Sequence, residues 1–310
     1  MILCIGTTPA AQRVMVFRSL VLDAVNRAAT TRDGAAGKSI NVAKVLKTLG
    51  EHPLATGFLG GDRGEELERL LKADGIESDF VKVTVRTRQC ITVIDQSTAM
   101  QTELVEESQP IASTDFDKLV AIIERRVKNC RAVVMSGTIT PGGAVDLYSR
   151  CTRMAQDAGA LSVVDASGAA LAEALKARPG LVKPNRMELA ATIGRELKDE
   201  SAVMSAMREL QERGAQRVVI TAGKDPALAF DGQSFWKIVT PRISLVNPIG
   251  SGDAFTAGLV WRLLRGEGID EACRWAAAAG AANALTLMAG EVNRNDLERL
   301  APDVVVQKVG

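Results

Sequence analysis

The segment that decides the fold reads Asn247-Pro248-Ile249-Gly250-Ser251-Gly252-Asp253-Ala254-Phe255-Thr256-Ala257-Gly258. An apolar approach, Ile243 to Val246, precedes it and is halted at Pro248, because proline has no backbone N–H to continue a regular element. The residues that follow predict a helix that begins near Asp253 and runs to Leu264. A glycine-rich turn therefore stands at the entrance to a helix.

Three small residues, Gly250, Ser251 and Gly252, occupy that helix N-terminus. Their backbone N–H groups lack intrahelical acceptors, the helix dipole adds partial positive charge, and the missing side chains let an anion come close. A phosphate is the expected occupant. Asp253 in the same turn has two interpretations: a carboxylate that only stabilises the helix, or a base held beside a transferring phosphoryl group.

Outward from this turn, short apolar runs alternate with helical patterns. Strands buried on both faces are expected at Ile2 to Gly6, Ala132 to Ser136, Leu161 to Asp165, Leu181 to Lys183 and Arg217 to Thr221. Apolar residues with a helical period fill 42–49 and 67–71, and Gly50 and Gly75 suit the C-caps of these helices. The alternation predicts an α/β fold with a parallel sheet and helices on both sides.

Two stretches break this alternation, at approximately 10–35 and 80–107. They contain β-rich runs such as Cys90-Ile91-Thr92-Val93-Ile94 without intervening helices. We expect a small antiparallel sheet that projects as a lid from a single main domain spanning 1–310. An isolated sheet of few strands must bury one face, so the lid is also a candidate surface for a homodimer.

Composition excludes several classes of function. The formal net charge is +1, which offers no field for a nucleic acid backbone or an anionic membrane. The five cysteines are scattered without a Cys-x-x-Cys pair, and the first apolar run is too short for a signal peptide or membrane span, so we expect buried thiols in a cytoplasmic protein. His52 is the only histidine, so general-base chemistry falls to a carboxylate or a lysine.

Two common nucleotide-binding motifs do not fit. Gly37-Lys38-Ser39 lacks the glycine five residues earlier that a P-loop requires, because Arg32 stands there. Gly6-Thr7-Thr8-Pro9 follows the first strand in place of the Gly-x-Gly-x-x-Gly of a Rossmann dehydrogenase. Both alternatives are rejected.

Further motifs accompany the glycine-rich turn in a fixed order. They are Ala35-Ala36-Gly37-Lys38-Ser39-Ile40-Asn41-Val42-Ala43, Thr87-Arg88-Gln89-Cys90, Ser136-Gly137-Thr138-Ile139-Thr140-Pro141-Gly142, Val164-Asp165-Ala166-Ser167-Gly168, Lys183-Pro184-Asn185-x-x-Glu188 and Thr221-Ala222-Gly223. In this order they resemble the ribokinase-like (PfkB-type) carbohydrate kinases, in the branch that contains 1-phosphofructokinase and tagatose-6-phosphate kinase. The resemblance covers nearly the whole chain and implies a three-layer α/β/α fold with a small β-sheet lid.

The resemblance also implies roles around ATP and Mg²⁺. Asp253 would be the catalytic base, and the amides of Gly250, Ser251 and Gly252 would form the anion hole. Asn185 and Glu188 would organise Mg²⁺, although a helix entry after Pro184 with a solvated glutamate is the alternative interpretation. The remaining cofactor-binding positions by resemblance are Lys183, Thr221, Gly223 and Asn283, the last of which could instead serve close helix packing.

On the sugar side, Lys38, Arg88 and Thr138 match positions that grip the phosphate of a phosphorylated substrate, and Arg27 is a fainter candidate. Gly37 and Asn41 belong to the sugar-binding signature. The chain departs from the family at Gln12, where an aspartate normally binds sugar hydroxyls. Ala36, Ser39 and Pro226 also replace glycines of the family pattern.

Three functions remain open at this stage. The first is ATP-dependent phosphorylation of a ketohexose monophosphate such as fructose 1-phosphate, fructose 6-phosphate or tagatose 6-phosphate. The second is a kinase of an unphosphorylated sugar or a nucleoside. The third is a non-catalytic sugar or nucleotide sensor, which Gln12 and Pro226 favour and the retained Asp253 and Glu188 disfavour.

Overall fold

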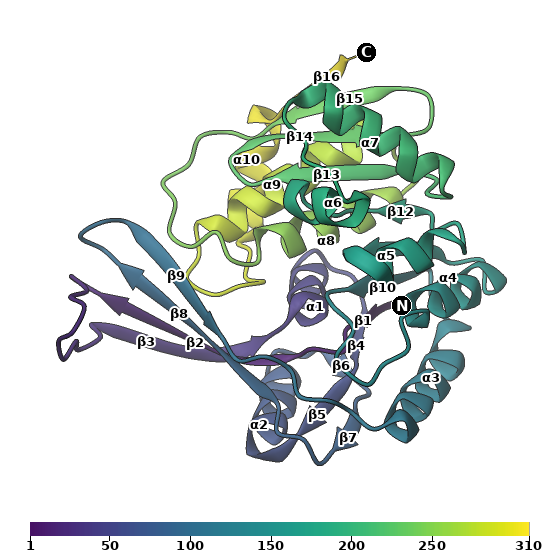
Figure 1. Cartoon of the computed structure of the whole chain (residues 1–310). Helices are drawn as coiled ribbons and strands as arrows, with labels where there is room; N and C mark the ends of the chain where they lie inside the picture. The colour runs from purple at the N-terminus through teal and green to yellow at the C-terminus, as the bar shows by residue number, and fades with distance from the viewer. Residues whose placement is uncertain (310) are drawn as a thin grey trace.

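A ten-stranded, mostly parallel sheet forms the body of the protein in the computed structural model, which describes residues 1–309 (Figure 1). Its order is β16-β15-β14-β13-β12-β11-β10-β1-β4-β6, and the strands from β13 to β16 pair antiparallel at one end. The strands are β1 (Ile2–Ile5), β4 (Pro53–Thr56), β6 (Glu77–Ser78), β10 (Ala132–Ser136), β11 (Leu161–Asp165), β12 (Leu181–Val182), β13 (Val218–Ala222), β14 (Asp225–Phe230), β15 (Phe235–Val239) and β16 (Val305–Val309).

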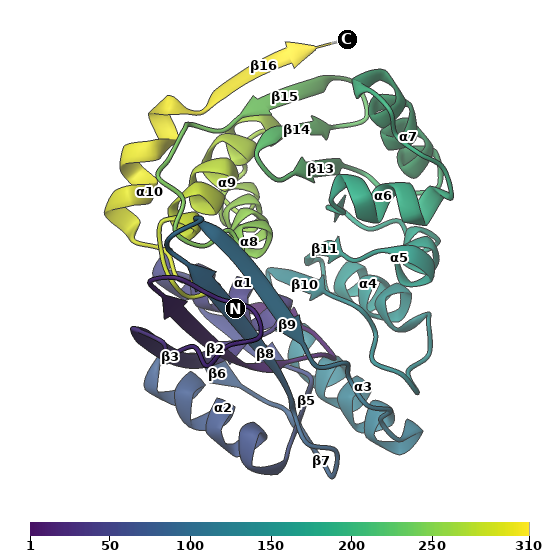
Figure 2. The same ribbon diagram turned by 60° about the vertical axis from the view of Figure 1, so that its left-hand side comes forward.

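Helices cover both faces of this sheet and bury two separate apolar cores (Figure 2). One core is formed with α1 (Lys38–Thr48), α2 (Gly61–Ala73), α8 (Ser251–Leu263), α9 (Ile269–Ala284) and α10 (Arg294–Leu300), which a 3₁₀ turn at Ala301–Asp303 follows. The other is formed with α3 (Ser113–Val127), α4 (Leu147–Asp157), α5 (Gly168–Leu175), α6 (Arg186–Ile193) and α7 (Glu200–Glu212). The three-layer α/β/α prediction is confirmed.

The predicted strands and helix ends are largely confirmed. Both depend on local features of the sequence, namely apolar runs and glycines at helix ends. Four-residue β1 is buried along its whole length, as expected of a central parallel strand. Gly50 and Gly75 follow α1 and α2 with φ of 83° and 65°, the left-handed conformation that suits glycine at a helix end. All five cysteines are buried free thiols. No helix within residues 1–309 combines the length and apolar character needed to cross a bilayer.

A second, smaller sheet projects from the body (Figure 1). It has the order β3-β2-β8-β9, with β2 (Ala10–Phe17), β3 (Thr30–Ala36), β8 (Arg88–Asp95) and β9 (Met100–Val105). The expected antiparallel arrangement needs correction, because the central pair β2 and β8 is parallel. Both strands leave the body in the same direction, and each returns through its own hairpin. We call this sheet the lid.

A small two-stranded sheet, β5 (Phe58–Gly60) with β7 (Val81–Val83), lies at the base of the lid. The strands of the lid alternate their side chains between two faces. Gln12 on β2 pairs in register with Cys90 on β8, so these side chains share a face, and both line the main cavity of the body. The lid therefore supplies one wall of that cavity.

Candidate active site

The main cavity has a volume of about 470 Å³ and lies at the carboxyl ends of the parallel strands, between the body and the lid. Its lining joins segments far apart in the sequence, namely Ala10, Gln12, Ala36, Gly37, Lys38, Asn41, Arg88, Cys90, Glu103, Val105, Asp165, Lys183, Asn185, Glu188, Thr221, Ile249, Gly250, Gly252, Asp253 and Ala289. Most of the predicted site residues are thus brought together. The volume lies within the range of small-ligand sites.

The glycine-rich turn forms one end of this cavity. Helix α8 begins at Ser251, two residues earlier than predicted, and Gly250 is its N-cap with φ 87° and ψ −8°. The N–H of Ser251 donates to the carbonyl of Pro248 at 3.1 Å, so this amide is already used. The amides of Gly252 and Asp253 have no acceptor among residues 1–309 and remain available for an anion.

Asp253 is a buried carboxylate without an ion pair to any residue in 1–309. It is 7% exposed, and its Oδ2 accepts a hydrogen bond from Nδ2 of Asn41 at 2.7 Å. Burial is the main cause that raises its pKa to about 7; the neighbouring Asp165 also raises it, while Lys38 and the Asn41 hydrogen bond oppose the shift. A carboxylate with a pKa near neutrality is suited to accept a proton from a hydroxyl group.

Asp165 is the centre of a buried charge network that sequence reasoning did not assign to the site. Its Oδ2 lies 3.1 Å from Nζ of Lys183 and accepts a hydrogen bond from Thr256 at 2.8 Å, and its Oδ1 lies 3.3 Å from Nζ of Lys38. Burial opposes its charge, but Lys183 and Lys38 outweigh burial and keep the pKa of Asp165 below its ordinary value. A carboxylate at the end of a strand predicted to be buried was the available sequence signal.

Lys38 connects this network to Glu188, whose Oε1 lies 2.9 Å from the Lys38 ammonium. Burial alone would lower the pKa of Lys38, but the carboxylates of Asp165 and Glu188 outweigh burial and raise it. Lys38 lines the cavity as predicted, with its charge already balanced by two carboxylates. Any phosphate that it contacts would therefore compete with these partners.

Asn185 and Glu188 form a capping box at the start of α6. Asn185 Oδ1 accepts from the Glu188 N–H and Glu188 Oε2 accepts from the Asn185 N–H, both at 2.8 Å. The helix entry is thus present, but the glutamate is not solvated as that interpretation expected, because Glu188 Oε1 pairs with Lys38 and the residue lines the cavity. Residues 1–309 contain no cage of three or more metal-ligating side chains. Mg²⁺ needs only one or two carboxylates beside phosphate oxygens and waters, and the oxygens of Glu188 and Asp165 near Lys38 fit that demand.

Two residues that line the cavity, Gln12 and Asn41, carry a buried amide oxygen without a hydrogen-bond partner. Gln12 is 2% exposed and donates from Nε2 to Thr92 at 3.4 Å, while its Oε1 is unpaired. Asn41 Oδ1 is buried and unpaired in the same way. Because buried polar atoms rarely remain unsatisfied, both atoms are positioned to accept hydrogen bonds from a ligand. Gly37, with φ 110°, packs against the backbone of Pro9 beside them.

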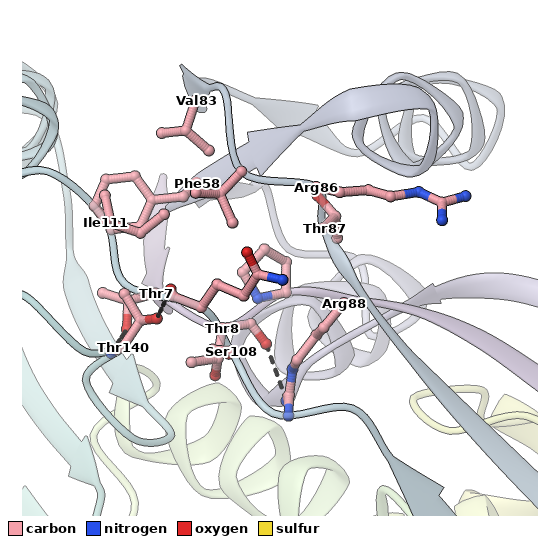
Figure 3. A pocket seen from close by; sticks show the side chains of 13 residues that line it. Thr7, Thr8, Phe58, Val83, Arg86, Thr87, Arg88, Ser108, Ile111 and Thr140 are labelled. Carbon is pink, nitrogen blue, oxygen red and sulfur yellow. Dashed lines mark hydrogen bonds between the residues drawn. The ribbon is translucent and has the colours of Figure 1, made fainter.

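Arg88 lies where three of the four segments that connect body and lid come together, around a second cavity of about 30 Å³ (Figure 3). Its guanidinium donates to the carbonyl of Thr8 at 3.2 Å and to that of Glu106 at 3.5 Å, and its buried Nε has no partner. Arg88 lines both cavities, whereas the side chain of Arg86 points away (Figure 3). Thr7 joins the same region to the body through Thr140.

Five predicted residues do not line the main cavity, and one of them is Ser251, whose N–H is bonded to Pro248. Arg27 is exposed in the hairpin loop between β2 and β3, and Gly223 is exposed in the turn between β13 and β14. Thr138 is exposed, and its carbonyl accepts from Thr7. Asn283 is fully buried behind the turn, where its amide donates to the carbonyl of Ile249 at 2.9 Å and accepts from the Gly290 N–H at 2.8 Å. Asn283 therefore supports the turn from behind.

Comparison with known proteins identifies the family to which this protein belongs. A model of the pfkB family of carbohydrate kinases matches residues 1–294, and this chain belongs to that family. It is 30% identical to a tagatose-6-phosphate kinase of Staphylococcus epidermidis over 312 residues, with both chains covered completely. Phosphofructokinase-2 of Escherichia coli, solved with substrates and products, is 27% identical with a TM-score of 0.87 over 97% of this chain and 98% of that one.

A more distant structure shows the fold alone. Ribokinase of Arabidopsis thaliana, solved with ribose and ATP, has 19% identity and a TM-score of 0.75 over 97% of this chain and 98% of that chain. The family resemblance expected from the motifs is thus confirmed, together with the ribokinase-like fold.

The buried charge of Asp253 predicts a stability effect that depends on pH. Because its pKa is raised to about 7, the folded state binds a proton that the unfolded state has lost, so stability falls as pH rises from about 4 to about 7. Asp253→Asn removes this charge. We expect the variant to melt at a higher temperature than the wild type at pH 8, with a smaller difference at pH 5, in calorimetric scans.

Asp117→Asn is the matched control, because it is the same substitution made on the exposed face of α3. Its effect on melting temperature should be small at both pH values. If the melting temperature of Asp253→Asn differed from that of the wild type by the same amount at pH 5 and pH 8, the buried-charge interpretation would be contradicted.

Proposed function

We propose that this protein transfers the terminal phosphoryl group of ATP to a hydroxyl of a ketohexose monophosphate, such as fructose 1-phosphate, fructose 6-phosphate or tagatose 6-phosphate. The observation that carries the proposal is the placement of Asp253. Its buried carboxylate lies beside the open amides of Gly252 and Asp253 itself, in one cavity with Arg88. Phosphoryl transfer to a phosphosugar requires a base, a site for the transferring phosphoryl group and a cationic group for the phosphate that the sugar already carries.

In the proposed reaction, the sugar hydroxyl oxygen forms a bond to the terminal phosphorus of ATP, and the bond from that phosphorus to the bridging oxygen breaks to release ADP. The hydroxyl proton passes to the Asp253 carboxylate, which Asn41 orients through its 2.7 Å hydrogen bond. The free amides of Gly252 and Asp253 stabilise negative charge on the transferring group. Lys183 and Lys38 are held in place by Asp165, and both line the cavity, where their ammonium groups would contact phosphate oxygens.

ATP and Mg²⁺ are the proposed cofactors. Glu188, with Asp165, would hold Mg²⁺, which when bound with ATP neutralises charge on the phosphates. Thr221 and Lys183, which line the cavity, would contact the nucleotide. At the sugar end, Gln12 Oε1 and Asn41 Oδ1 would accept hydrogen bonds from sugar hydroxyls, and Arg88 would bind the substrate's own phosphate. Gln12 is neutral, so its hydroxyl preference differs from that of a carboxylate.

A panel of phosphorylated sugars, free sugars and nucleosides in an ADP-release assay tests the proposal. We expect turnover with one or more ketohexose monophosphates and a loss of about a hundredfold to ten-thousandfold in kcat for Asp253→Asn, because the base is removed. Substrate binding should change much less.

Each alternative has its own outcome in this panel. Turnover confined to free sugars or nucleosides would overturn the phosphosugar assignment and favour the second function. Binding of nucleotide or sugar without turnover on any substrate would favour a sensor.

Arg88→Met tests the phosphate contact separately. Because the variant loses a charge-assisted hydrogen bond, we expect the KM for the sugar phosphate to rise about 10- to 100-fold, with the KM for ATP nearly unchanged. Arg86→Met is the control: Arg86 is two residues away and pairs with Asp62 at 2.6 Å on the surface. Equal effects of both variants on the sugar phosphate KM would contradict the assignment of Arg88.

The lid is also the proposed surface for a homodimer. Large apolar side chains are exposed at its hairpin tip, with Leu22 at 86% and Val25 at 83%, and Met100 and Leu104 are exposed on the face turned away from the cavity. Phosphofructokinase-2 of Escherichia coli has a tetrameric inhibited form. Sedimentation equilibrium should give twice the mass of one chain, and Leu22→Glu combined with Val25→Glu should give single chains; a monomeric wild type would exclude the dimer.

A further inference from the structure

The lid touches the body at a further place, away from the four segments that connect them. The contact is made by residues 286–292, which follow α9 and which we call the docking segment. Met288 is 1% exposed and packs in a small apolar cluster with Val14 and Val16 of β2 and Ile94 of β8. A side chain at Gly34 of β3 would lie 2.6 Å from the Met288 methyl, so the lid has a glycine where Met288 inserts.

An ion pair adds a second link at the same place. Arg32 of β3 reaches Glu291 with both terminal nitrogens, at 3.0 Å and 3.3 Å. The two residues are 259 positions apart in sequence, and their side chains are 48% and 35% exposed. The pair therefore joins the outer strand of the lid to the docking segment, and it remains accessible to solvent ions.

The other side of the docking segment contacts the glycine-rich turn at residues 247–253, which we call the catalytic turn. The Ala289 carbonyl accepts a hydrogen bond from Lys44 at 2.9 Å, and its backbone is so close to Gly250 that a side chain there would lie 2.9 Å from Ala289 Cα. A side chain at Gly290 would likewise lie 2.7 Å from Asn41 Cα. Asn41 is the residue that binds Asp253.

From these contacts we infer that the docking segment couples the position of the lid to the position of the catalytic turn, with Arg32, Met288 and Glu291 as positioning residues. One side of a seven-residue segment packs against the lid, and the opposite side packs against Gly250 and Asn41. Closely packed neighbours transmit displacement because they leave no space to absorb it. The kinetic part of this inference rests on the proposed function.

A neighbouring ion pair provides a matched control. Arg13 of β2 and Asp33 of β3 pair at 2.6 Å and are 45% and 46% exposed, so they resemble Arg32 and Glu291 in charge and exposure. Asp33 follows Arg32 on the same strand and therefore points to the opposite face of the lid. Within residues 1–309, Arg13 and Asp33 form their ion pair only with each other.

Charge reversal tests the coupling by kinetics. Arg32→Glu and Glu291→Arg should each raise the KM for the sugar phosphate about three- to tenfold and lower kcat, with a smaller effect on the KM for ATP, because like charges push the lid from the docking segment. The double variant R32E/E291R should return within about twofold of the wild type, and Arg13→Glu should change little. Single variants within twofold of the wild type, or a double variant no better than the worse single one, would overturn the inference.

Hydrogen exchange of the ligand-free protein tests the same coupling without any substrate. Arg32→Glu should increase deuterium uptake in residues 286–292 and in the catalytic turn at 247–253, whereas Arg13→Glu should increase uptake only within the lid. Unchanged uptake at 247–253 in Arg32→Glu would contradict the coupling. Because no substrate is present, this result stays decisive even if the panel shows no turnover and the proposed function fails.

Discussion

The buried carboxylate of Asp165 engages both lysines of the cavity, and the rest of the site depends on this arrangement. Lys183 and Lys38 are held at 3.1 Å and 3.3 Å from its two oxygens. The neighbouring Asp253 is consequently left without a direct cationic partner while it remains buried. Burial without an ion pair raises a carboxyl pKa, and the value of about 7 gives Asp253 the proton affinity of an effective base near neutral pH. Two aspartates a short distance apart thus acquire opposite properties from their surroundings.

Close packing holds the turn beside Asp253 in place. Gly250 adopts a left-handed conformation and lies against Ala289, so a larger residue would displace the turn or the docking segment. Asn283 supports the turn from the protein side, with its amide bound to Ile249 and Gly290. The open amides of Gly252 and Asp253 are therefore fixed before a ligand arrives, which is the condition for effective electrostatic stabilisation.

The sequence predicted features that depend on local physics and missed those that depend on tertiary packing. Strand β1 and the helix-closing Gly50 and Gly75 were correctly predicted, because burial on both faces and a left-handed C-cap leave clear local patterns. The parallel pairing of β2 with β8 was missed, since nothing in either strand records the direction in which its partner leaves the body. The capping interpretation of Asn185 and Glu188 was open in the sequence and is resolved by their reciprocal hydrogen bonds.

Site residues follow the same division. Asp253, Lys38 and Arg88 were brought to one cavity as their motifs predicted. Asp165 received no role of its own, because its partners Lys38, Lys183 and Thr256 lie 127, 18 and 91 positions away in the chain. Arg27 stands apart from the cavity because the hairpin loop that carries it extends away from the body (Figure 1). Spacing in sequence cannot reveal how far such a loop reaches.

The central claim is that Asp253 is a buried carboxyl group with strongly raised proton affinity. A ¹³C NMR titration of the protein labelled at aspartate carboxyl carbons measures this directly, with Asp253→Asn used to assign the resonance. The account predicts a carboxyl signal that titrates near pH 7 and is absent from the variant. Titration of the Asp253 signal at the pH of ordinary exposed aspartates, about 4, would contradict it.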